Sequence, residues 1–486
     1  MSHINPKFRL MIYQPKTDDP LELVDGIKSI TSTRTISGEG SIQLDFSDTG
    51  KLRLRIPSGG YVTSTVRDIF TLHTIIALHV KKNEKDAWRQ LNLGYVDTVS
   101  HKAGAGGSHG YSFTFPTLDK KFREAELFID YQKVSDKDKN KKNPTVQQQT
   151  IEAAITNVAD TFKSMKTIPT IIQAVWDNLI CDLMQVKLVQ DPNPNISGRV
   201  NFGGKYFLAQ TQEPDEAGLL SAEIMLSGLT TNITQIFELT SCFAFGQSVN
   251  FWQVLFSVLS EPFYEMFIDP LETVEGEEGF LEGQTYYIIK QGQSKFVFRK
   301  TPFDEYFLNG SWSLTKPKTF HTIQPEDIKD FSIIYDSKEI YSGVHVGLGI
   351  LDIANILIAP VKWNNLIRGI SGNPRVLQVK LAGLGFDKDS APEARAGIIE
   401  VLEALRDQLY EIFFQPDDLK IGRGSMMTSF DFYRVGKPFE VDQIKINEVE
   451  LPTLGYITGV TDTFDAAGQA ASNVQFKWVP CNMVQN

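Results

Sequence analysis

The chain has 486 residues, more than one hydrophobic core usually organises, so we expect two to four domains. Hydrophobic residues make up 42% and aromatic residues 11%, which excludes a largely disordered chain, and the 32 Phe residues favour a β-rich core. The formal net charge of −11 argues against general binding of nucleic acid through surface charge, although it is compatible with an acidic passage that nucleic acid slides through.

The first 132 residues carry the pattern of a compact antiparallel β domain. Apolar side chains alternate with polar ones, or run continuously, over stretches of strand length, and glycines separate these stretches as turns. We expect strands at 8–13, 41–46, 51–56, 69–80, 91–99 and 111–115. Together they predict a barrel, or a sheet curled around one core, over 1–132.

A glycine-rich run at 103–110 separates the last two of these strands. It lacks the Lys-Ser/Thr pair of a phosphate-binding loop, and it joins two strands instead of opening a helix. The run therefore favours a long hairpin loop over a phosphate site.

The composition changes after the first domain. The run 133–144 is rich in Lys and Asp without interleaved aromatic residues, which is typical of an exposed linker and not of a nucleic-acid surface. Apolar residues then recur at helical spacing over 151–165 and 172–183, and a third helical region is expected at about 233–267. The sequence thus predicts a helix-rich insert over 145–283.

We expect a second β domain assembled from two pieces, 284–345 and 422–486. In the first piece, 294–299 alternates like an edge strand and stops ahead of Pro302, which cannot donate a hydrogen bond to a sheet. Further strands are expected at 331–335, 455–464 and 473–479.

The two pieces are separated by a helical interruption over 346–421. Ser390 and Glu393 have the spacing of a capping box, and the apolar stripe 398–412 follows at helical intervals. This stripe predicts either packing on the chain's own core or a seam between subunits. The apolar run 344–363 predicts a buried segment or a subunit contact, because the polar residues within it argue against a transmembrane helix.

Two groups of residues invite comparison with metal or carboxylate sites. His73 and His79 would share one face of a strand, but no third zinc ligand stands at a usual spacing, so we interpret them as structural or interface histidines. The acidic run 272–282 is interspersed with glycine, which predicts a solvated loop and not a carboxyl group whose pKa burial has raised.

A third group supplies the residue types of a catalytic triad. Asp97, His101, Ser108 and His109 lie in or beside the glycine-rich run, without the motif of a nucleophile elbow. We therefore predict no catalytic, cofactor-binding or metal-binding residues, no cofactor and no enzyme activity.

The cysteines and the start of the chain bear on its compartment. Cys181, Cys242 and Cys481 are odd in number and far apart, which excludes a disulfide framework and fits a reducing compartment. The segment 1–6 lacks the charged-then-apolar pattern of a signal peptide.

Three stretches in the second half carry motifs. The stretch 251–267 is apolar and ends in Pro-Phe-Tyr-Glu-Met-Phe, and 296–304 reads Phe-Val-Phe-Arg-Lys-Thr-Pro-Phe-Asp. The third comprises 434–439 and 455–464, and its closing strand ends Lys-Trp-Val-Pro at 477–480. In their order and spacing they resemble the baseplate hub proteins of contractile phage tails and related contractile injection systems. Such hubs share an Arg-Pro-Thr-Pro-Phe-Asp turn, which departs here by one Lys, and often end in Arg-Gly, which is missing here.

The resemblance implies an α+β, β-dominated fold with two tube-type antiparallel β-barrel domains, the second interrupted by helix. It implies a homotrimeric ring of six barrels that joins the sixfold tail tube to the threefold central spike and lets DNA or effector cargo pass. Its partners would be the central spike protein, the tail tube or tube-initiator protein, baseplate wedge proteins and a tape measure protein. DNA would be only transiting cargo, with no stable membrane insertion.

The implied location is the tail baseplate of a virion, assembled in the host cytoplasm. A negatively charged lumen would suit DNA passage by repulsion of its phosphates. Two other functions compete with the hub: a tail-tip peptidoglycan hydrolase, which needs a catalytic cleft, and a host receptor-binding tail protein, which needs exposed aromatic platforms.

Overall fold

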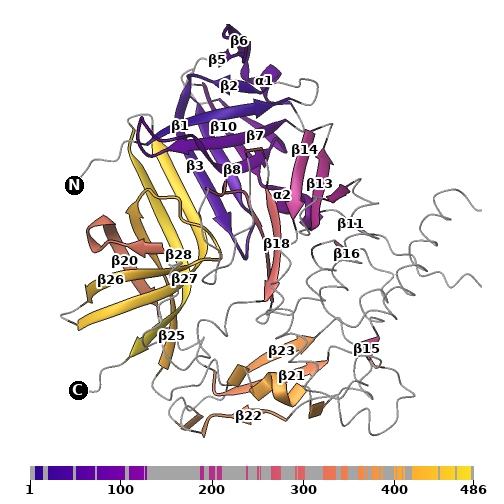
Figure 1. Cartoon of the computed structure of the whole chain (residues 1–486), viewed down its shortest axis with the longest axis vertical. Helices are drawn as coiled ribbons and strands as arrows, with labels where there is room; N and C mark the ends of the chain where they lie inside the picture. The colour runs from indigo at the N-terminus through magenta and orange to yellow at the C-terminus, as the bar shows by residue number, and fades with distance from the viewer. Residues whose placement is uncertain are drawn as a thin grey trace, which may run out of the picture.

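The computed structural model shows a chain built mainly of strands (Figure 1). The β-dominated, largely antiparallel character that the sequence predicts is confirmed. The structure describes residues 6–14, 20–46, 51–71, 74–103, 109–124, 126–127, 186–190, 196–202, 205–210, 237–238, 249–250, 252, 264–274, 291–292, 294–300, 321–334, 341–348, 360–365, 368–369, 375–381, 385–386, 399–400, 402–407, 409–410, 419–446, 449–465 and 468–482.

A six-stranded antiparallel sheet comes entirely from the first 95 residues. Its strands are β1 (Lys7–Tyr13), β2 (Leu21–Leu23), β5 (Lys51–Arg55), β6 (Tyr61–Thr65), β7 (Ile75–Lys81) and β8 (Arg89–Tyr95). They lie in the order β6-β5-β2-β1-β7-β8, so β6 and β8 are its two edges. Apolar residues alternate in β5, where Leu52 and Leu54 are buried, which is the pattern of a sheet with one covered face.

A ten-stranded sheet combines strands from both ends of the chain. Its members are β3 (Ile27–Thr35), β4 (Ser41–Phe46), β9 (Thr98–Ala103), β10 (His109–Pro116), β19 (His321–Ile323), β20 (Ile328–Ile334), β25 (Leu419–Ser429), β26 (Pro438–Ile446), β27 (Val449–Asp465) and β28 (Ala470–Asn482). The continuous path runs β20-β25-β28-β27-β3-β4-β10-β9, and β26 branches from it to pair with β27 and β19. The antiparallel pair β27–β3 therefore joins the two ends of the chain in one sheet.

The hydrophobic core lies between the six-stranded sheet and the N-terminal part of the ten-stranded sheet. Phe46, Phe70, Phe113 and Phe115 form a cluster whose ring centroids lie 5.1–6.0 Å apart. Aromatic pairs at such distances add to the burial energy of the rings, which is one use of the abundant Phe. Phe430 and Phe464, from the C-terminal end, belong to the same core, so both ends of the chain share it.

Smaller elements surround these two sheets. They are α1 (Val66–Ile69), α2 (Leu118–Glu124), β11 (Glu126–Leu127), β12 (Val186–Gln190), β13 (Ile196–Phe202), β14 (Lys205–Gln210), β15 (Phe237–Glu238), β16 (Val249–Asn250), β17 (Tyr264–Asp269), β18 (Lys295–Lys300), a 3-10 helix η5 (Pro325–Asp327), β21 (Gly343–Leu348), β22 (Lys362–Trp363), β23 (Val376–Leu381) and β24 (Gly385–Phe386). None of the helices in the described part of the chain has the length and apolar character needed to cross a membrane.

Most of the expected strands are confirmed, and two expectations need correction. The strand expected at 69–80 starts only at Ile75, because Thr65 caps the short helix α1 by accepting a hydrogen bond from the Asp68 N–H at 3.2 Å. The helical region expected at about 233–267 is wrong where strands are described within it: β15 and β16 lie inside this range, and β17 at its end pairs with β18. Residues 265–269 are buried on both faces of this strand, so the apolar run has no strand period to recognise.

The insert and the interruption are described only in part. The described part of the expected helix-rich insert includes the antiparallel meander β12-β13-β14, so the helical prediction is wrong there. The predicted linker 133–144 and the helices at 151–165 and 172–183 lie outside the described residues. In the run 344–363, β21 pairs with β22 and β23 and buries Val344 and Val346, which supports a buried strand there.

The stripe 398–412 is helical where it is described. Leu402 and Leu409 have no exposed surface within a single chain. These two positions pack on the chain's own core, as one of the two interpretations of the stripe predicts.

Candidate functional site

The junction between β3 and β27 is the first candidate site. Their register places Thr33 opposite Thr461 and Ser32 opposite Asp462, across more than 400 residues of sequence. Side chains alternate across the sheet, so one face of the junction carries Ser32, Arg34 and Asp462, and all three are buried. A buried polar row at a strand pair needs internal partners, because it has lost its water.

Arg34 and Asp462 form a buried ion pair in this row. The Arg34 Nη2 donates to the Asp462 Oδ2 at 2.6 Å, and the two side chains are 1% and 0% exposed. Arg34 Nη1 also donates to the Tyr433 carbonyl oxygen at 2.8 Å, and the Ser472 hydroxyl donates to the second Asp462 oxygen at 2.6 Å. Burial raises the pKa of Asp462, while Arg34 and Ser472 act against that rise.

A second buried ion pair ties β17 to the C-terminal half. The Arg434 guanidinium, which has no exposed surface, donates to the carboxylate of Asp269 and to the carbonyl oxygens of Leu271 at 3.0 Å and Glu272 at 3.1 Å. The Tyr456 hydroxyl donates to the buried carboxylate of Glu265, also on β17. These contacts hold the segment 264–272 against Arg434, which lies between β25 and β26, and against Tyr456 on β27, some 160 to 190 residues away.

The same segment is held from the other side by β8. The Gln90 backbone N–H donates to the Glu272 carboxylate at 2.7 Å, its side chain donates to the Pro270 carbonyl at 2.7 Å, and Arg89 donates to the Glu272 carbonyl at 2.8 Å. Glu272 is therefore not part of a solvated loop, which corrects the sequence-based expectation at this residue. Burial raises its pKa, and the Gln90 N–H opposes that shift. The other acidic residues of the run lie outside the described residues.

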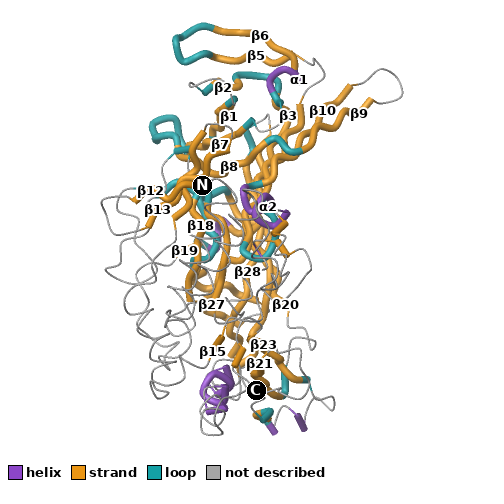
Figure 2. Tube along the Cα trace, turned by 90° about the vertical axis from the view of Figure 1, so that its right-hand side faces the viewer, coloured by secondary structure: helices purple, strands orange, loops and turns teal. Residues whose placement is uncertain are grey.

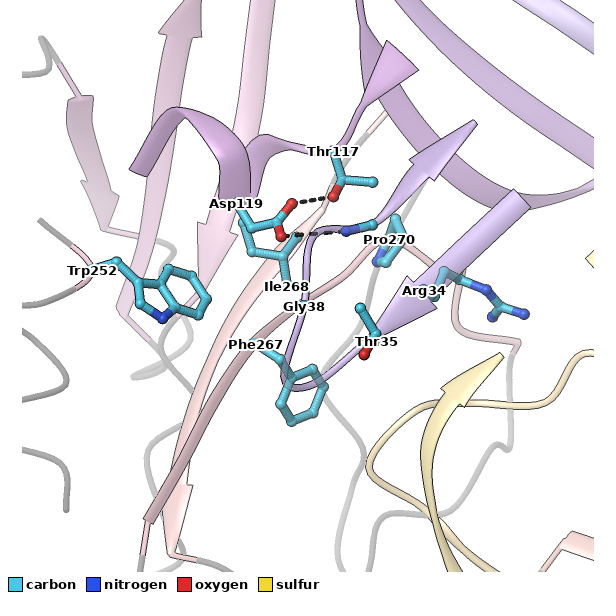
Figure 3. A pocket seen from close by; sticks show the side chains of 10 residues that line it. Arg34, Thr35, Gly38, Thr117, Asp119, Trp252, Phe267, Ile268 and Pro270 are labelled. Atoms are coloured by element: carbon cyan, nitrogen blue, oxygen red, sulfur yellow. Dashed lines mark hydrogen bonds between the residues drawn. The ribbon is translucent and has the colours of Figure 1, made fainter. Parts of the chain in front are cut away.

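A small pocket lies beside this junction (Figure 3). Asp119 on its wall accepts hydrogen bonds from the Thr117 hydroxyl and, at 3.4 Å, from the Gly40 N–H, and burial raises its pKa. The pocket volume is about 10 Å³, which is about what one water molecule needs. A pocket of this size holds no organic substrate.

Three residues of the considered triad lie on or next to the β9–β10 hairpin. Asp97 accepts a hydrogen bond from Lys120 at 2.6 Å, while His101 and His109 sit at different registers of the β9–β10 hairpin. Ser108 lies outside the described residues. The antiparallel pairing of β9 with β10 confirms that the glycine-rich run closes a hairpin. No group of three potential metal ligands occurs among the residues that the structure describes.

His79 is buried in β7, whereas His73 lies outside the described residues. The Nδ1 atom of His79 accepts a hydrogen bond from the Arg9 Nε at 3.3 Å. Burial, and then the positive charge of Arg9, lower the pKa of His79 to about 3. The imidazole is therefore neutral and structural, as the sequence interpretation holds.

Acidification is expected to destabilise the protein through His79. The folded-state pKa is about 3 against an ordinary value of 6.5, so the unfolded chain binds the extra proton between these values, and stability falls as pH falls through this window. The loss is about 1.4 kcal/mol per pH unit, or about 2 kcal/mol between about pH 6.5 and 5. Urea unfolding at several pH values measures it, with His79→Gln as the comparison, because Gln keeps an acceptor for Arg9. Equal pH dependence in the two proteins would contradict this assignment.

The exposed face of the ten-stranded sheet is the second candidate surface. Opposite the buried residues, small uncharged polar side chains follow one another across paired strands. One row reads Met427, Asn473, Thr461, Thr33 and Ser41, from β25 to β4. The next reads Ser429, Ala471, Thr463, Thr31, Gln43 and Thr114, from β25 to β10. We call these two rows the polar face; they cross the junction between the chain ends without interruption.

No protein-family model and no curated protein matches the sequence. Among solved structures, the chain is similar to a 43 kDa tail protein of prophage MuSo2 from Shewanella oneidensis, at 10% identity and a TM-score of 0.44, over 97% of this chain and 98% of that one. It is also similar to a tail protein from Neisseria meningitidis, at 10% identity and a TM-score of 0.42, over 97% and 96% of the two chains.

A third similar structure is an Escherichia coli component of the type VI secretion system, itself described as similar to the bacteriophage T4 tail proteins gp27 and gp5. Identity is 7% and the TM-score 0.36, over 98% of this chain and 77% of that one. The structural neighbours are thus tail proteins and a secretion-system component.

Proposed function

We propose that this chain is a non-enzymatic structural hub of a contractile tail or injection machine, located in the tail baseplate. Three copies would form a ring around a passage, between the tail tube and the central spike. The observation that carries the proposal is the β27–β3 pair. It joins two groups of strands, which we call β units, into one continuous sheet: β3, β4, β9 and β10 from the N-terminal part, and β19, β20 and β25–β28 from the C-terminal part. The resemblance of the motifs at 251–267, 296–304, 434–439 and 455–464 to those of baseplate hub proteins is the reason for proposing a hub.

The two edge strands of this sheet could pair with edge strands of neighbouring chains in the ring. Strand β20 is one end of the path and β9 the other, and neither pairs with a further strand among the described residues. Unpaired sheet edges tend to associate, and repeated edge pairing around a rotation axis closes a ring. Ile334 on β20 is 51% exposed, and a strand paired at this edge would cover part of it. Three chains would contribute six β units.

The polar face would line the passage in this ring. Its two rows carry hydroxyl, amide and small side chains and one Met, and the next row of the same face carries the carboxylates of Asp465 and Asp45. A wall of this kind offers few strong contacts to a passing polymer. On this placement Asp45 and Asp465 beside the two rows have the sign of the acidic passage that the net charge suggests, so weak adhesion and repulsion of phosphates would both let cargo pass.

Light scattering of the purified chain, with negative-stain imaging of the same fraction, tests the ring. We expect the mass of a trimer and an open centre in wild-type protein. Ile334→Lys should give monomers, because it puts a charge into the paired edge, whereas Val24→Lys, at a 40% exposed position just after β2 of the six-stranded sheet, should leave the ring intact. A wild-type monomer that stays monomeric with spike and tube proteins added would overturn the proposal and reopen the hydrolase and receptor-binding alternatives.

A further inference from the structure

Strand β6 is an edge that lacks the usual protection. It forms one end of the six-stranded sheet and lies at the far end of the molecule from β21 and β23 (Figure 2). Natural edge strands carry charges, Pro or bulges that prevent pairing with other chains. The sequence Tyr-Val-Thr-Ser-Thr of β6 has none of these, and its five residues are all at least partly exposed. In β-propensity it is well suited to accept another strand.

The hydrogen-bonding groups of β6 that point outward can be identified. The Ile56 N–H donates to the Gly60 carbonyl at 2.9 Å, so 56 and 60 form a hydrogen-bonded pair. Because such pairs alternate along an antiparallel ladder, Val62 and Ser64 bond to β5, while the backbone groups of Tyr61 and Thr63 face away from it. Among the described strands, only β5 pairs with β6.

One face of this edge is basic. Lys51, Arg53 and Arg55 alternate along β5 on its exposed face, in a chain whose net charge is −11. The guanidinium carbons of Arg53 and Arg55 lie 4.1 and 5.6 Å from the centre of the Tyr61 ring, so both side chains contact β6 on this face. Glu22, at 3.2 Å from Arg55, partly neutralises that arginine, so Arg53 contributes more of the positive charge beside Tyr61.

The other face of the same edge is apolar. On this face Leu54 of β5 is buried, and its cross-strand partner on β6, Val62, is 44% exposed. A strand added beside β6 would cover Val62 with the side chains on one of its faces and meet the arginines with those on the other.

We propose that β6 binds an extended segment of another protein in which acidic side chains alternate with apolar ones. The segment would add a seventh strand to the sheet, with main-chain hydrogen bonds to Tyr61 and Thr63 supplying affinity and the basic row supplying specificity. This binding site is distinct from the ring edges β9 and β20 and does not require the ring.

The probe is a fluorescein-labelled peptide in which Glu alternates with Val, titrated with the full-length chain and followed by fluorescence anisotropy. Thr63→Pro removes one outward N–H and leaves the β5–β6 ladder intact, so affinity should fall about tenfold or more. Thr63→Val keeps that N–H and should bind like wild type. A Lys/Val peptide should bind about tenfold more weakly than the Glu/Val peptide, and Arg53→Glu should remove this preference.

Equal binding of the Glu/Val peptide to wild type and Thr63→Pro, equal affinity for both peptides, or no binding up to about 1 mM overturns the proposal. Circular dichroism melting of both Thr63 variants shows whether each is folded. If light scattering shows wild-type self-association that Thr63→Pro abolishes, the occupant is a second copy, and the acidic partner is wrong. The ring is assayed separately with Ile334→Lys, so failure of one proposal does not imply failure of the other.

Discussion

Replacing Arg434 with Met is expected to destabilise the protein by about 3–5 kcal/mol, because it leaves the Asp269 carboxylate buried without its cation. Asp269 is 3% exposed, and water cannot replace the lost partner without opening the packing. The carbonyls of Leu271 and Glu272 lose a donor at the same time. Urea unfolding followed by circular dichroism measures the change in the free energy of unfolding.

The matched control is Arg67→Met, since Arg67 is an exposed arginine in the short helix α1. It should change stability by less than about 0.5 kcal/mol. A loss below about 1 kcal/mol in Arg434→Met would mean that the Asp269 carboxyl is already neutral or hydrated, and the junction would need another explanation.

Much of this fold follows from the period-two pattern of its strands. In β4 and β5 every second residue is apolar and buried, and the expected and observed strands agree almost residue for residue. The closing pair β27–β28 was predictable for the same reason. In these strands the local sequence and the tertiary environment favour the same structure.

Strand β3 could not be predicted in that way. Its buried face carries Ile30, then Ser32 and Arg34, so the hydropathy alternation disappears where the strand enters the junction. Its partner β27 likewise buries Asp462 between Val460 and Phe464. A charged residue at an inward-facing position of a strand is the signal that a reader of the sequence could use. The pairing of two such positions across more than 400 residues cannot be derived from local spacing.

The helix predicted over the segment 264–269 was wrong for a different reason. Residues 265–269 are covered on both faces, so exposed polar and buried apolar positions do not alternate. The carboxylates of Glu265 and Asp269 are tolerated there because Tyr456 and Arg434 donate hydrogen bonds to them. Local pattern therefore predicts strands with one covered face well, and it is least informative at the polar junction, where buried charges pair over long distances.

The ion pair at β3 and β27 should show strong coupling in a double-mutant cycle. Arg34→Met and Asp462→Leu, made singly, should each cost about 3–5 kcal/mol, because each leaves an uncompensated charge with almost no exposed surface. The double variant should lose much less than the sum, since both charges are then gone. Some loss should remain, about 1 kcal/mol for each hydrogen bond that disappears at Tyr433 and Ser472.

Urea unfolding of the four proteins gives the coupling energy, and the shape of the transition gives a second result. Because β27–β3 joins two β units, the single variants should unfold in two steps, whereas the wild type and the double variant should unfold in one. Additive losses would instead show that Arg34 and Asp462 stabilise their own strands independently. The edge pairing that the proposed ring repeats between chains would then be held by backbone hydrogen bonds and apolar packing, without the ion pair.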